Sequence, residues 1–384
     1  MTKSEIITPY TARNILISKQ LFTGKKVLND KSDLFNIIEI LGYVQIDTIS
    51  VVERSHHHVL WTRMSDYNRS MIDELLEKDK LIFEYWSHAA AFLPMKDFRF
   101  SLLRKRNYRD KYKSWGLANK KLIRKVYAVV KSNGPMLSKD FAGERKKNTG
   151  WWDWKPSKDA LDFLFHSGKL MVLKRKSFQK VYDLTERVIP EKTDTTFPSE
   201  IDFYKYLLYT SINANGFTSE KETMYLRKYN RSLFKKMINE LTEDNIISII
   251  EIKGFENEKF FAFKNNLEKL YNVKKSNELF LLSPFDNFVI QRRRLQSLFN
   301  FDFQIECYVP KNKRKFGYFC LPVLSGDTFI GRIDLKADRK QKKLYVINFF
   351  PERNSKINNK QTIDLKRKLM LLAEFCGCNE IIGI

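Results

Sequence analysis

Long apolar runs are missing from the sequence, and their absence excludes a membrane-spanning class of protein. No stretch approaches the roughly 18 consecutive apolar residues of a membrane-spanning helix. The N-terminal segment MTKSEIITPYTARNILISKQ also lacks the apolar core of a secretory signal. The sequence therefore predicts a soluble, cytoplasmic protein.

Cysteine and histidine are also scarce, with four and five residues in the chain. Cys376 and Cys378 form an isolated C-x-C pair, without the second pair or the histidines of a zinc site. Three of the histidines are consecutive: His56, His57 and His58. Adjacent side chains on a helix or strand point in different directions, so three in a row rarely bind one ion. We therefore expect free thiols, and neither a metal nor another cofactor.

Acidic residues are too few to balance the basic ones. The 384 residues include 69 Lys and Arg against 45 Asp and Glu, which gives a net charge of +24. Such a surplus repels itself unless an anion is bound, and nucleic acid is the commonest anionic partner, ahead of anionic membranes. A general basic bias of the proteome is the alternative explanation. The length and the 43% hydrophobic content favour two or three folded domains over disorder.

The strongest basic cluster is the segment 96–131, which we interpret as helical with one apolar side. It contains 13 Lys or Arg against Asp97 and Asp110. Aromatic residues are interleaved with the cations: Phe98, Phe100, Tyr108, Tyr112 and Trp115. A solvated helix face is the simpler interpretation, but this excess of cations is larger than solubility requires. We therefore expect the segment to contact nucleic acid.

Two later segments have the element order of a winged helix, in which two helices precede a β-hairpin. In residues 134–190, KPSKDALDFLFHSGKL predicts the second helix, and LMVLKRK with KVYDLTERVIP predicts a hairpin across Ser177–Gln179. In the later segment a helix begins near Thr218, LFKKMINELTEDN predicts another, and IISIIEIKG with KFFAFK predicts the hairpin. We expect the first hairpin to be a basic wing, because it carries LKRK and Lys180.

From Phe280 onwards the pattern changes to short alternating segments separated by turn residues. FQIECYVP, KFGYFCLPVL, TFIGRIDLKAD and KLYVINFF predict an antiparallel sheet, and TIDLKRKLMLLAEFCGC predicts a helix packed on it. The sequence thus predicts an α+β fold with tandem winged helices. Its four regions are an N-terminal helical region with the catalytic motif (1–130), a first winged helix (131–192), a second winged helix (200–275) and a C-terminal β-rich domain with a terminal helix (276–384).

The segment LGYVQIDTISVVERSHHHVLWTR, residues 41–63, places polar residues inside an apolar run. Apolar residues at helical spacing precede it and predict a helix that ends at Gly42. If the next residues are extended, their period of two puts Gln45 and Asp47 on one face, about 6–7 Å apart. Alternatively, Asp47 caps a following helix, and Gln45 is an ordinary polar residue of a half-exposed strand.

This segment resembles a known family. The stretch QIDTISVVERSHHHVLWTR is similar to the signature of the AlkZ/YcaQ-type winged-helix DNA glycosylases, which repair interstrand crosslinks. Further blocks resemble the same family in the same order: GWWDWKPSKDALDFLFHSGKLMV, FQKVYDLTERVIP, LSPFDNFVIQRRRLQSLFNFDFQIECYVP and KRKFGYFCLPVLSGDTFIGRIDLKADRK. The resemblance covers about residues 10–350.

The resemblance implies that tandem winged helices hold duplex DNA in a concave basic cleft and that N7-alkylated purines are removed by hydrolysis. The family's catalytic pair lies in a Q-x-Q or Q-x-D motif, and this chain has the Q-x-D form of the crosslink-unhooking branch, Gln45 and Asp47. Because an N7-alkylated purine is already cationic, it leaves easily and needs little acid catalysis. Asp47 is expected to activate water and stabilise the oxocarbenium-like sugar, while Gln45 positions water and backbone. No lysine accompanies the pair, so we expect no lyase activity.

The expected partner is double-stranded DNA with an alkylated or crosslinked guanine, bound by a monomer. Phosphate binding by such an enzyme should be largely independent of sequence and strongly dependent on salt. The residues expected to contact DNA are Arg54, His56, His57, His58, Arg63, Lys174, Arg175, Lys176, Gln179, Arg292, Arg293 and Arg294.

Three other functions fit parts of the sequence. A winged-helix transcription regulator without catalysis would prefer one operator sequence, but it gives no reason for Gln45 and Asp47 outside both winged helices. A metal-dependent nuclease built on Asp47 and the histidines lacks the carboxylate cluster of such sites. An inactive glycosylase fold kept for DNA binding is the third, and the intact Q-x-D motif argues against it.

Overall fold

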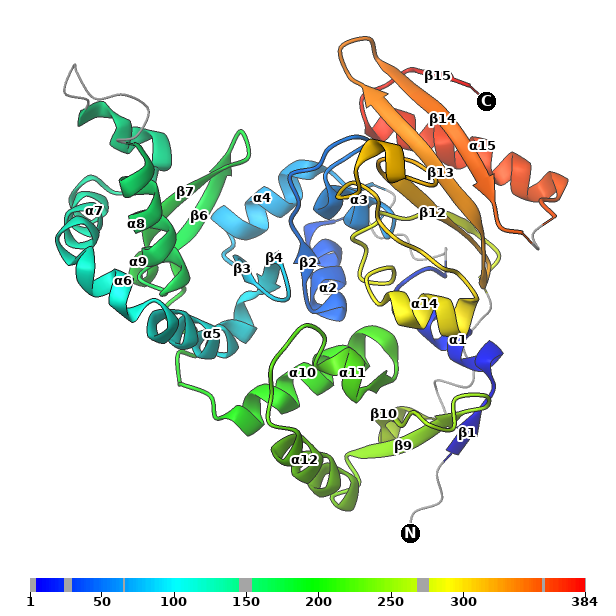
Figure 1. Ribbon diagram of the computed structural model, residues 1–384, viewed down its shortest axis with the longest axis horizontal. Helices are drawn as coiled ribbons and strands as arrows, with labels where there is room; N and C mark the ends of the chain where they lie inside the picture. The colour runs from blue at the N-terminus through cyan, green and yellow to red at the C-terminus, as the bar shows by residue number, and fades with distance from the viewer. Residues whose placement is uncertain are drawn as a thin grey trace. The chain divides into compact units, whose positions relative to one another are not determined.

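The structure is a computed structural model that describes residues 5–23, 30–64, 66–144, 154–267, 276–353 and 356–383. It has a mixed α+β fold, as the sequence predicts (Figure 1). The chain divides into two compact units, one made of Met1–Tyr67 with Tyr204–Ile384 and the other of Asn68–Phe203. This division falls within the predicted N-terminal region, and the four-region scheme stays a prediction. Among the described helices none is long and apolar enough to cross a membrane.

The first unit begins with β1 (Glu5–Ile7), α1 (Pro9–Lys19) and α2 (Lys31–Leu41). The helix predicted to end at Gly42 is confirmed, since α2 stops there and Gly42 has a φ of 74°. A Cβ on this residue would lie 2.1 Å from Cγ2 of Thr210, so the position requires glycine on two grounds. The short strand β2 (Val44–Gln45) and helix α3 (Ser55–Trp61) follow.

The later winged-helix segment belongs to the first unit. It comprises α10 (Glu200–Asn215), β8 (Thr218–Ser219), α11 (Glu220–Thr223), α12 (Arg231–Glu243), β9 (Ile247–Ile252) and β10 (Phe260–Phe263). Ser219 caps α11 in a capping box with Glu222, which accounts for the helix start predicted near Thr218. β10 pairs antiparallel with β8 and β9, and β1 adds to β9 in parallel. The order of elements is the one predicted.

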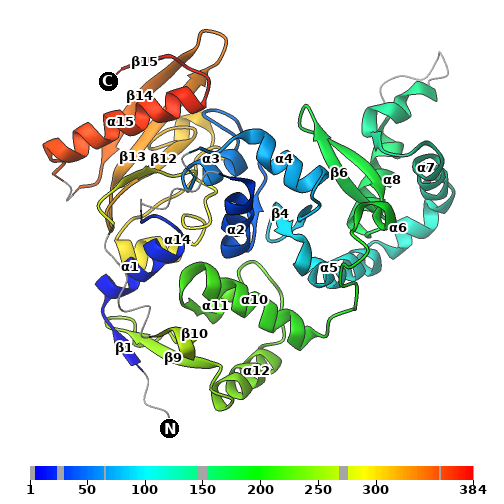
Figure 2. The same ribbon diagram turned by 180° about the vertical axis from the view of Figure 1, so that it is seen from behind.

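The C-terminal sheet has the order β11-β12-β13-β14-β15. Its strands are β11 (Leu279–Leu281), β12 (Cys320–Ser325), β13 (Thr328–Asp338), β14 (Lys343–Pro351) and β15 (Glu380–Ile382). The pairs are antiparallel as predicted, except that β15 runs parallel to β14. The predicted terminal helix is confirmed as α15 (Asn359–Phe375), which lies along this sheet (Figure 2).

One predicted strand of this region is wrong. FQIECYVP, residues 303–310, follows α14 (Arg292–Phe299) without forming a strand. The carboxylate of Glu306 accepts the backbone N–H groups of Lys315, Phe316 and Gly317 at 2.8, 2.8 and 3.0 Å. A side chain therefore satisfies these donors, while Phe303 and Ile305 supply the alternating apolar pattern as buried residues of a loop.

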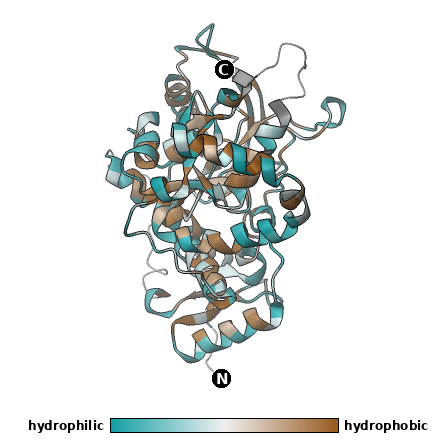
Figure 3. Cartoon of the chain, turned by 90° about the vertical axis from the view of Figure 1, so that its left-hand side faces the viewer, coloured by the Kyte–Doolittle hydropathy of each residue, from teal (hydrophilic) through white to brown (hydrophobic). Residues whose placement is uncertain are grey.

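The second unit begins with α4 (Arg69–Glu77) and the hairpin of β3 (Ile82–Trp86) and β4 (Ala90–Pro94). The basic segment 96–131 is helical as predicted, with α5 (Phe98–Lys111), α6 (Lys113–Ala118) and α7 (Lys120–Asn133). Hydrophobic and hydrophilic residues alternate along the helices (Figure 3), which is typical of helices that bury one side.

The earlier winged-helix segment completes this unit. It comprises β5 (Met136–Leu137), the 3-10 helix η2 (Ser138–Glu144), α8 (Trp154–His166), β6 (Leu170–Lys176), β7 (Gln179–Leu184) and α9 (Thr185–Val188). β7 pairs with both β5 and β6, so the pairing pattern is that of β10 with β8 and β9. The strand predicted over KVYDLTERVIP ends at Leu184, because α9 begins at the next residue. Residues 150–153 of the sequence block GWWDWK lie outside the described residues.

Candidate active site

Gln45 is the last residue of β2, and Asp47 lies beyond the strand. Val44, Gln45 and Ile46 are all buried, while Asp47 is half-buried. The expected alternation of an apolar and a polar face therefore does not hold, because the strand is two residues long and both of its sides are covered. Of the two polar side chains of the motif, Gln45 is thus inside the unit and Asp47 reaches its surface.

A turn of the backbone fixes the carboxylate of Asp47. Its Oδ1 accepts the N–H of Ile49 at 2.7 Å, which is an Asx turn. The alternative of a helix cap is wrong, since α3 begins eight residues later, at Ser55, with Arg54 at the cap position. Burial raises the pKa of Asp47 above its ordinary value, and the backbone hydrogen bonds only partly oppose this effect. Among the described residues no Lys or Arg forms an ion pair with it.

The loop after Asp47 is anchored to the C-terminal sheet. The N–H of Ala337 donates to Val51 O at 2.9 Å, and Arg339 donates to Val52 O at 2.5 Å. Val52 is fully buried in a hydrophobic core that also contains β12, β13 and α15 residues. These contacts tie the chain just after the Asp47 turn to the C-terminal sheet.

Cys307 and Tyr308 lie in the neighbourhood of this carboxylate. Burial raises the pKa of both Cys307 and Tyr308, and the charge of Asp47 raises each of them further. The charge of Arg292 lowers the pKa of Cys307 in turn. Because Tyr308 is 73% exposed, the side of Asp47 near this residue is open to solvent. Arg292 is exposed at the start of α14 and places a cation near Cys307.

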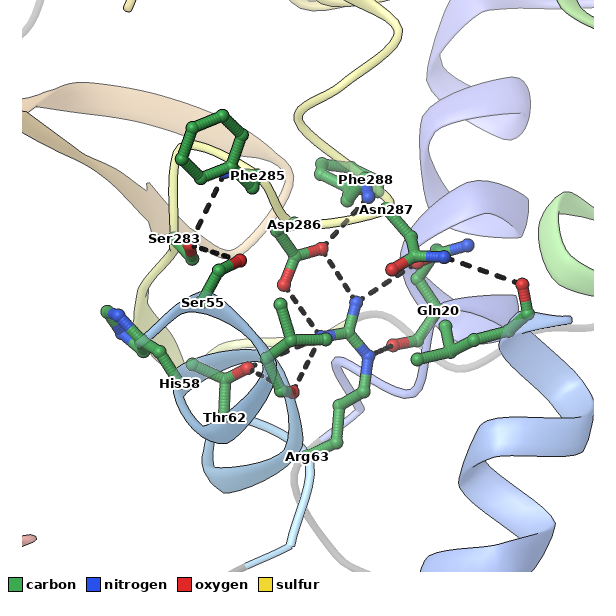
Figure 4. A network of polar contacts seen from close by, with 12 residues as sticks. Gln20, Ser55, His58, Thr62, Arg63, Ser283, Phe285, Asp286, Asn287 and Phe288 are labelled. Atoms are coloured by element: carbon green, nitrogen blue, oxygen red, sulfur yellow. Dashed lines mark hydrogen bonds and ion pairs between the residues drawn. The ribbon is translucent and has the colours of Figure 1, made fainter. Parts of the chain in front are cut away.

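A buried ion pair joins Arg63, just beyond α3, to Asp286 (Figure 4). The guanidinium of Arg63 donates to both carboxylate oxygens of Asp286, at 2.7 and 2.8 Å, and both side chains are completely buried. Its remaining donors reach the backbone and side-chain oxygens of Gln20 and the backbone oxygen of Val59, each at 3.0 Å. The expected DNA contact of Arg63 is therefore wrong in this structure, because its donors are satisfied inside the unit.

Asp286 and Asn287 make contacts around the Q-x-D segment, and the sequence did not single them out. Asn287 donates to Tyr43 O at 2.9 Å, two residues before Gln45. Asp286 holds Arg63 just beyond α3, so this adjacent pair fixes the chain on both sides of the Q-x-D segment (Figure 4). The available signal was an acid and an amide side by side within the apolar run LLSPFDNFVI.

The histidine triplet lies in α3 and is largely internal. His58 is fully buried with Nε2 2.9 Å from Leu281 O, and burial lowers its pKa, which keeps the ring neutral. His56 is also buried, while Nδ1 of the half-buried His57 lies 2.7 Å from the hydroxyl of Tyr67. Burial contradicts the expected DNA contacts of His56 and His58, whereas His57 and the half-buried Arg54 remain candidates. Among the described residues no group of three His, Cys, Asp or Glu could hold a metal ion.

The three consecutive arginines at the start of α14 also differ in their exposure to solvent. Arg292 and Arg293 are exposed, but Arg294 is buried. Arg294 donates to Glu222 at 2.6 Å and to Asn215 at 2.7 Å, so it joins α14 to the second winged-helix segment. Its expected DNA contact is therefore wrong, and the two exposed arginines stay candidates.

The predicted basic wing is present in the second unit as the hairpin β6–β7. Lys176 and Gln179 are exposed beside the turn. Arg175 is 11% exposed and donates to both carboxylate oxygens of Glu84 at 2.8 Å, and Lys174 lies 2.5 Å from Glu77. Arg175 therefore serves first as an anchor of the hairpin, while Lys174, Lys176 and Gln179 remain candidates for DNA contact.

Comparison with known proteins agrees with this geometry. Among solved structures, the DNA glycosylase AlkZ of Streptomyces sahachiroi has the same fold, with a TM-score of 0.65, 13% sequence identity and 99% of each chain covered. A family model described as "DNA glycosylase AlkZ-like" matches residues 38–375, a range that contains Gln45, Asp47, Asp286 and the triple arginine. The resemblance found in the sequence is thus confirmed, and the chain belongs to the AlkZ-like family of DNA glycosylases.

Proposed function

We propose that the chain hydrolyses the N-glycosidic bond of N7-alkylated purines in duplex DNA, including purines that form interstrand crosslinks. The observation that carries this proposal is the carboxylate of Asp47, which is fixed by its turn and half-buried at an open side of the unit. Its raised pKa favours the role of a general base, because a catalytic base works best when its pKa lies near the working pH.

The two motif residues have different parts in this reaction. Asp47 orients and deprotonates water and stabilises the positive charge that develops on the sugar. Gln45 cannot titrate, so its amide positions the water and the DNA backbone. Because Gln45 is buried, this part requires its side chain to become accessible when DNA binds. Phosphate binding falls to the exposed Arg292, which lies near Cys307, a neighbour of Asp47. The partner is double-stranded DNA, and we expect the protein to act as a monomer without a cofactor.

The proposed reaction has no lyase step. Schiff-base chemistry requires an amine at the reacting sugar, and among the described residues no lysine contributes to the electrostatic environment of Asp47. We expect alkali-labile abasic sites without strand nicking. A covalent protein–DNA adduct trapped by borohydride would contradict this expectation.

The decisive experiment measures base release from a duplex with one N7-alkylguanine and from one with an N7–N7 crosslink. Asp47→Asn should reduce the rate by about 10²–10⁴-fold while duplex binding is retained. The matched control is Asp73→Asn, because burial also raises the pKa of Asp73 but this residue belongs to the other unit. Activity of Asp47→Asn equal to that of the control, or no release by the wild type, would disprove the assignment.

The pH profile gives a second test of the same residue. The base must be ionised, so the rate should fall as the pH drops through the pKa of Asp47. Because burial raises this pKa, the acid limb should lie above the ordinary value of an aspartate. The residual rate of Asp47→Asn should lack this limb, and an unchanged limb in the variant would assign the base to another group.

A further inference from the structure

Four rings form a continuous row on the second unit, outside the proposed active site. Trp86 ends β3, Tyr108 and Tyr112 lie one turn apart at the end of α5, and His166 ends α8. The ring centroids are 6.0 Å apart for Trp86 and His166, 4.9 Å for His166 and Tyr108, and 4.5 Å for Tyr108 and Tyr112. We call these four residues the ring row.

The ring row is partly open to solvent and has a cation at each end. Trp86 and Tyr112 are 37% and 38% exposed, and the two rings between them are half-buried. The guanidinium of Arg104 lies 5.4 Å from the centre of the Trp86 ring, and the ammonium of Lys111 lies 5.1 Å from that of Tyr112. Rings that only packed the core would be buried at both ends, so packing alone does not explain this arrangement.

His166, one of the two inner rings, carries no charge. The hydroxyl of Tyr85 donates to its backbone O at 2.7 Å, which fixes the backbone that carries this ring. Burial, with the charges of Lys180 and Arg104, lowers the pKa of His166 to about 4. At pH 7 the imidazole is therefore a neutral stacking surface, and the cations lie at the ends of the row.

We propose that the ring row binds unpaired bases of single-stranded DNA. Every base has a π-face that stacks on an aromatic side chain, and this contact does not depend on sequence. The exposed cations Arg104 and Lys111 can bind the phosphates on either side of the stacked bases. A regular duplex cannot use the row, because its bases already stack on one another.

Acidic groups near the row limit the contact to its exposed side. Burial and Tyr112 raise the pKa of Tyr108, and Asp162 and Asp159 of α8 raise it further, so negative charge lies on that flank. Lys180 partly offsets Asp162. We therefore expect the single-stranded DNA to contact the two ends of the ring row, Trp86 and Tyr112, and not to pass between Tyr108 and α8. This binding goes beyond base release and does not depend on Asp47.

The test compares two fluorescent oligonucleotides of equal length, one of thymidine and one of abasic units, by anisotropy with the full chain. Wild type should bind the thymidine oligonucleotide more tightly. Trp86→Ala and Tyr112→Ala should each reduce that affinity by roughly 5- to 100-fold and leave abasic binding unchanged. Trp86→Phe keeps a ring and should retain most of the affinity.

The matched control is Phe197→Ala. Phe197 is also an exposed aromatic residue of the second unit, 47% exposed, with the guanidinium of Arg106 4.4 Å from its ring centre, but it is not part of the ring row. Equal binding of the two oligonucleotides by wild type would overturn the proposal. So would equal losses in the control and the row variants, or tighter binding of a uridine RNA oligonucleotide.

Photocrosslinking of the wild type keeps the test decisive if an alanine variant does not fold. An oligonucleotide with one iodouracil base should crosslink to Trp86 or Tyr112, because the base stacks directly on these rings. Crosslinks found only on peptides outside the ring row would exclude it as the binding surface.

Discussion

The two hairpins of the winged-helix segments have the same pairing pattern but different surroundings. In both, the last strand pairs with a short preceding strand and with its hairpin partner. The hairpin β9–β10 is extended by β1, whereas β6 is the edge of its sheet as the structure describes it (Figure 1). Ile250 of β9 and Phe260 of β10 join a large hydrophobic core with α1 and α14.

The hairpin β6–β7 is held mainly by charge along its exposed half. Glu84 receives two hydrogen bonds from Arg175 and an ion pair from Lys180, and Glu77 contacts Lys174. The hairpin β9–β10 thus packs into a hydrophobic core, whereas the hairpin β6–β7 keeps its cations near the surface. The order of elements is the same in the two segments while their surroundings differ, and the proposed DNA contact belongs to the hairpin β6–β7.

Truncating one buried side chain of the hairpin β9–β10 should have the largest effect on stability. Ile250→Ala removes a completely buried side chain from the centre of a sheet and leaves a cavity. We expect the free energy of unfolding of the first unit to fall by about 2–5 kcal/mol, measured by urea titration. Salt dependence of duplex binding by the folded fraction should not change. A change in that dependence would mean that β9–β10 also contacts DNA.

The ionic anchor of the other hairpin should have the next largest effect. Glu84→Gln removes a buried carboxylate from two cations, of which Arg175 is 11% and Lys180 27% exposed, so partial hydration limits the loss. We expect the second unit to lose about 2 kcal/mol of stability. Glu258→Gln in the connection between β9 and β10 is the control and should change stability little. A loss for Glu84→Gln as small as that expected for the control would show that charge does not anchor the hairpin β6–β7.

The sequence was sufficient for those features that depend on local pattern. The helix that ends at Gly42, the two hairpins and the order of elements in both winged-helix segments follow from spacing and turn residues. The Q-x-D motif was recognised because it lies in a long stretch similar to the family. What could not be predicted depends on contacts between distant residues.

Arg63 shows why distant contacts defeat a sequence argument. In the sequence it is a basic residue near a predicted active site, which is typical of a phosphate contact. Its partner Asp286 lies 223 residues away, and only the fold brings the two together. The same reason applies to Arg294, which meets Glu222 over a separation of 72 residues. The net charge of the sequence includes these arginines, although they are buried and cannot contact an anion outside the protein.

Neutralising one exposed wing cation should have a smaller effect, on DNA binding alone. Lys176→Gln should weaken duplex binding uniformly across sequences and reduce the slope of log K against log salt by about 1. Lys176 is exposed beside the turn of β6–β7. Lys259→Gln, a lysine just before β10, is the control and should leave the slope unchanged. A reduced slope for Lys259→Gln with an unchanged slope for Lys176→Gln would assign the DNA contact to the hairpin β9–β10.

The turns of the two hairpins should give the smallest effects, and with opposite signs. Ser177 has a φ of 48° without being glycine, whereas Gly254 has a φ of 89° with open space among the described residues where a Cβ would lie. Ser177→Gly should relieve strain and raise the stability of the second unit by about 0.5 kcal/mol, after the entropy cost of glycine is subtracted. Gly254→Ala should lower the stability of the first unit by about 1 kcal/mol, because alanine rarely adopts this φ. Thermal unfolding of both variants measures the two signs. Since a strained two-residue turn persists only where its surroundings hold it, no gain from Ser177→Gly would mean that the contacts of the turn itself offset the strain.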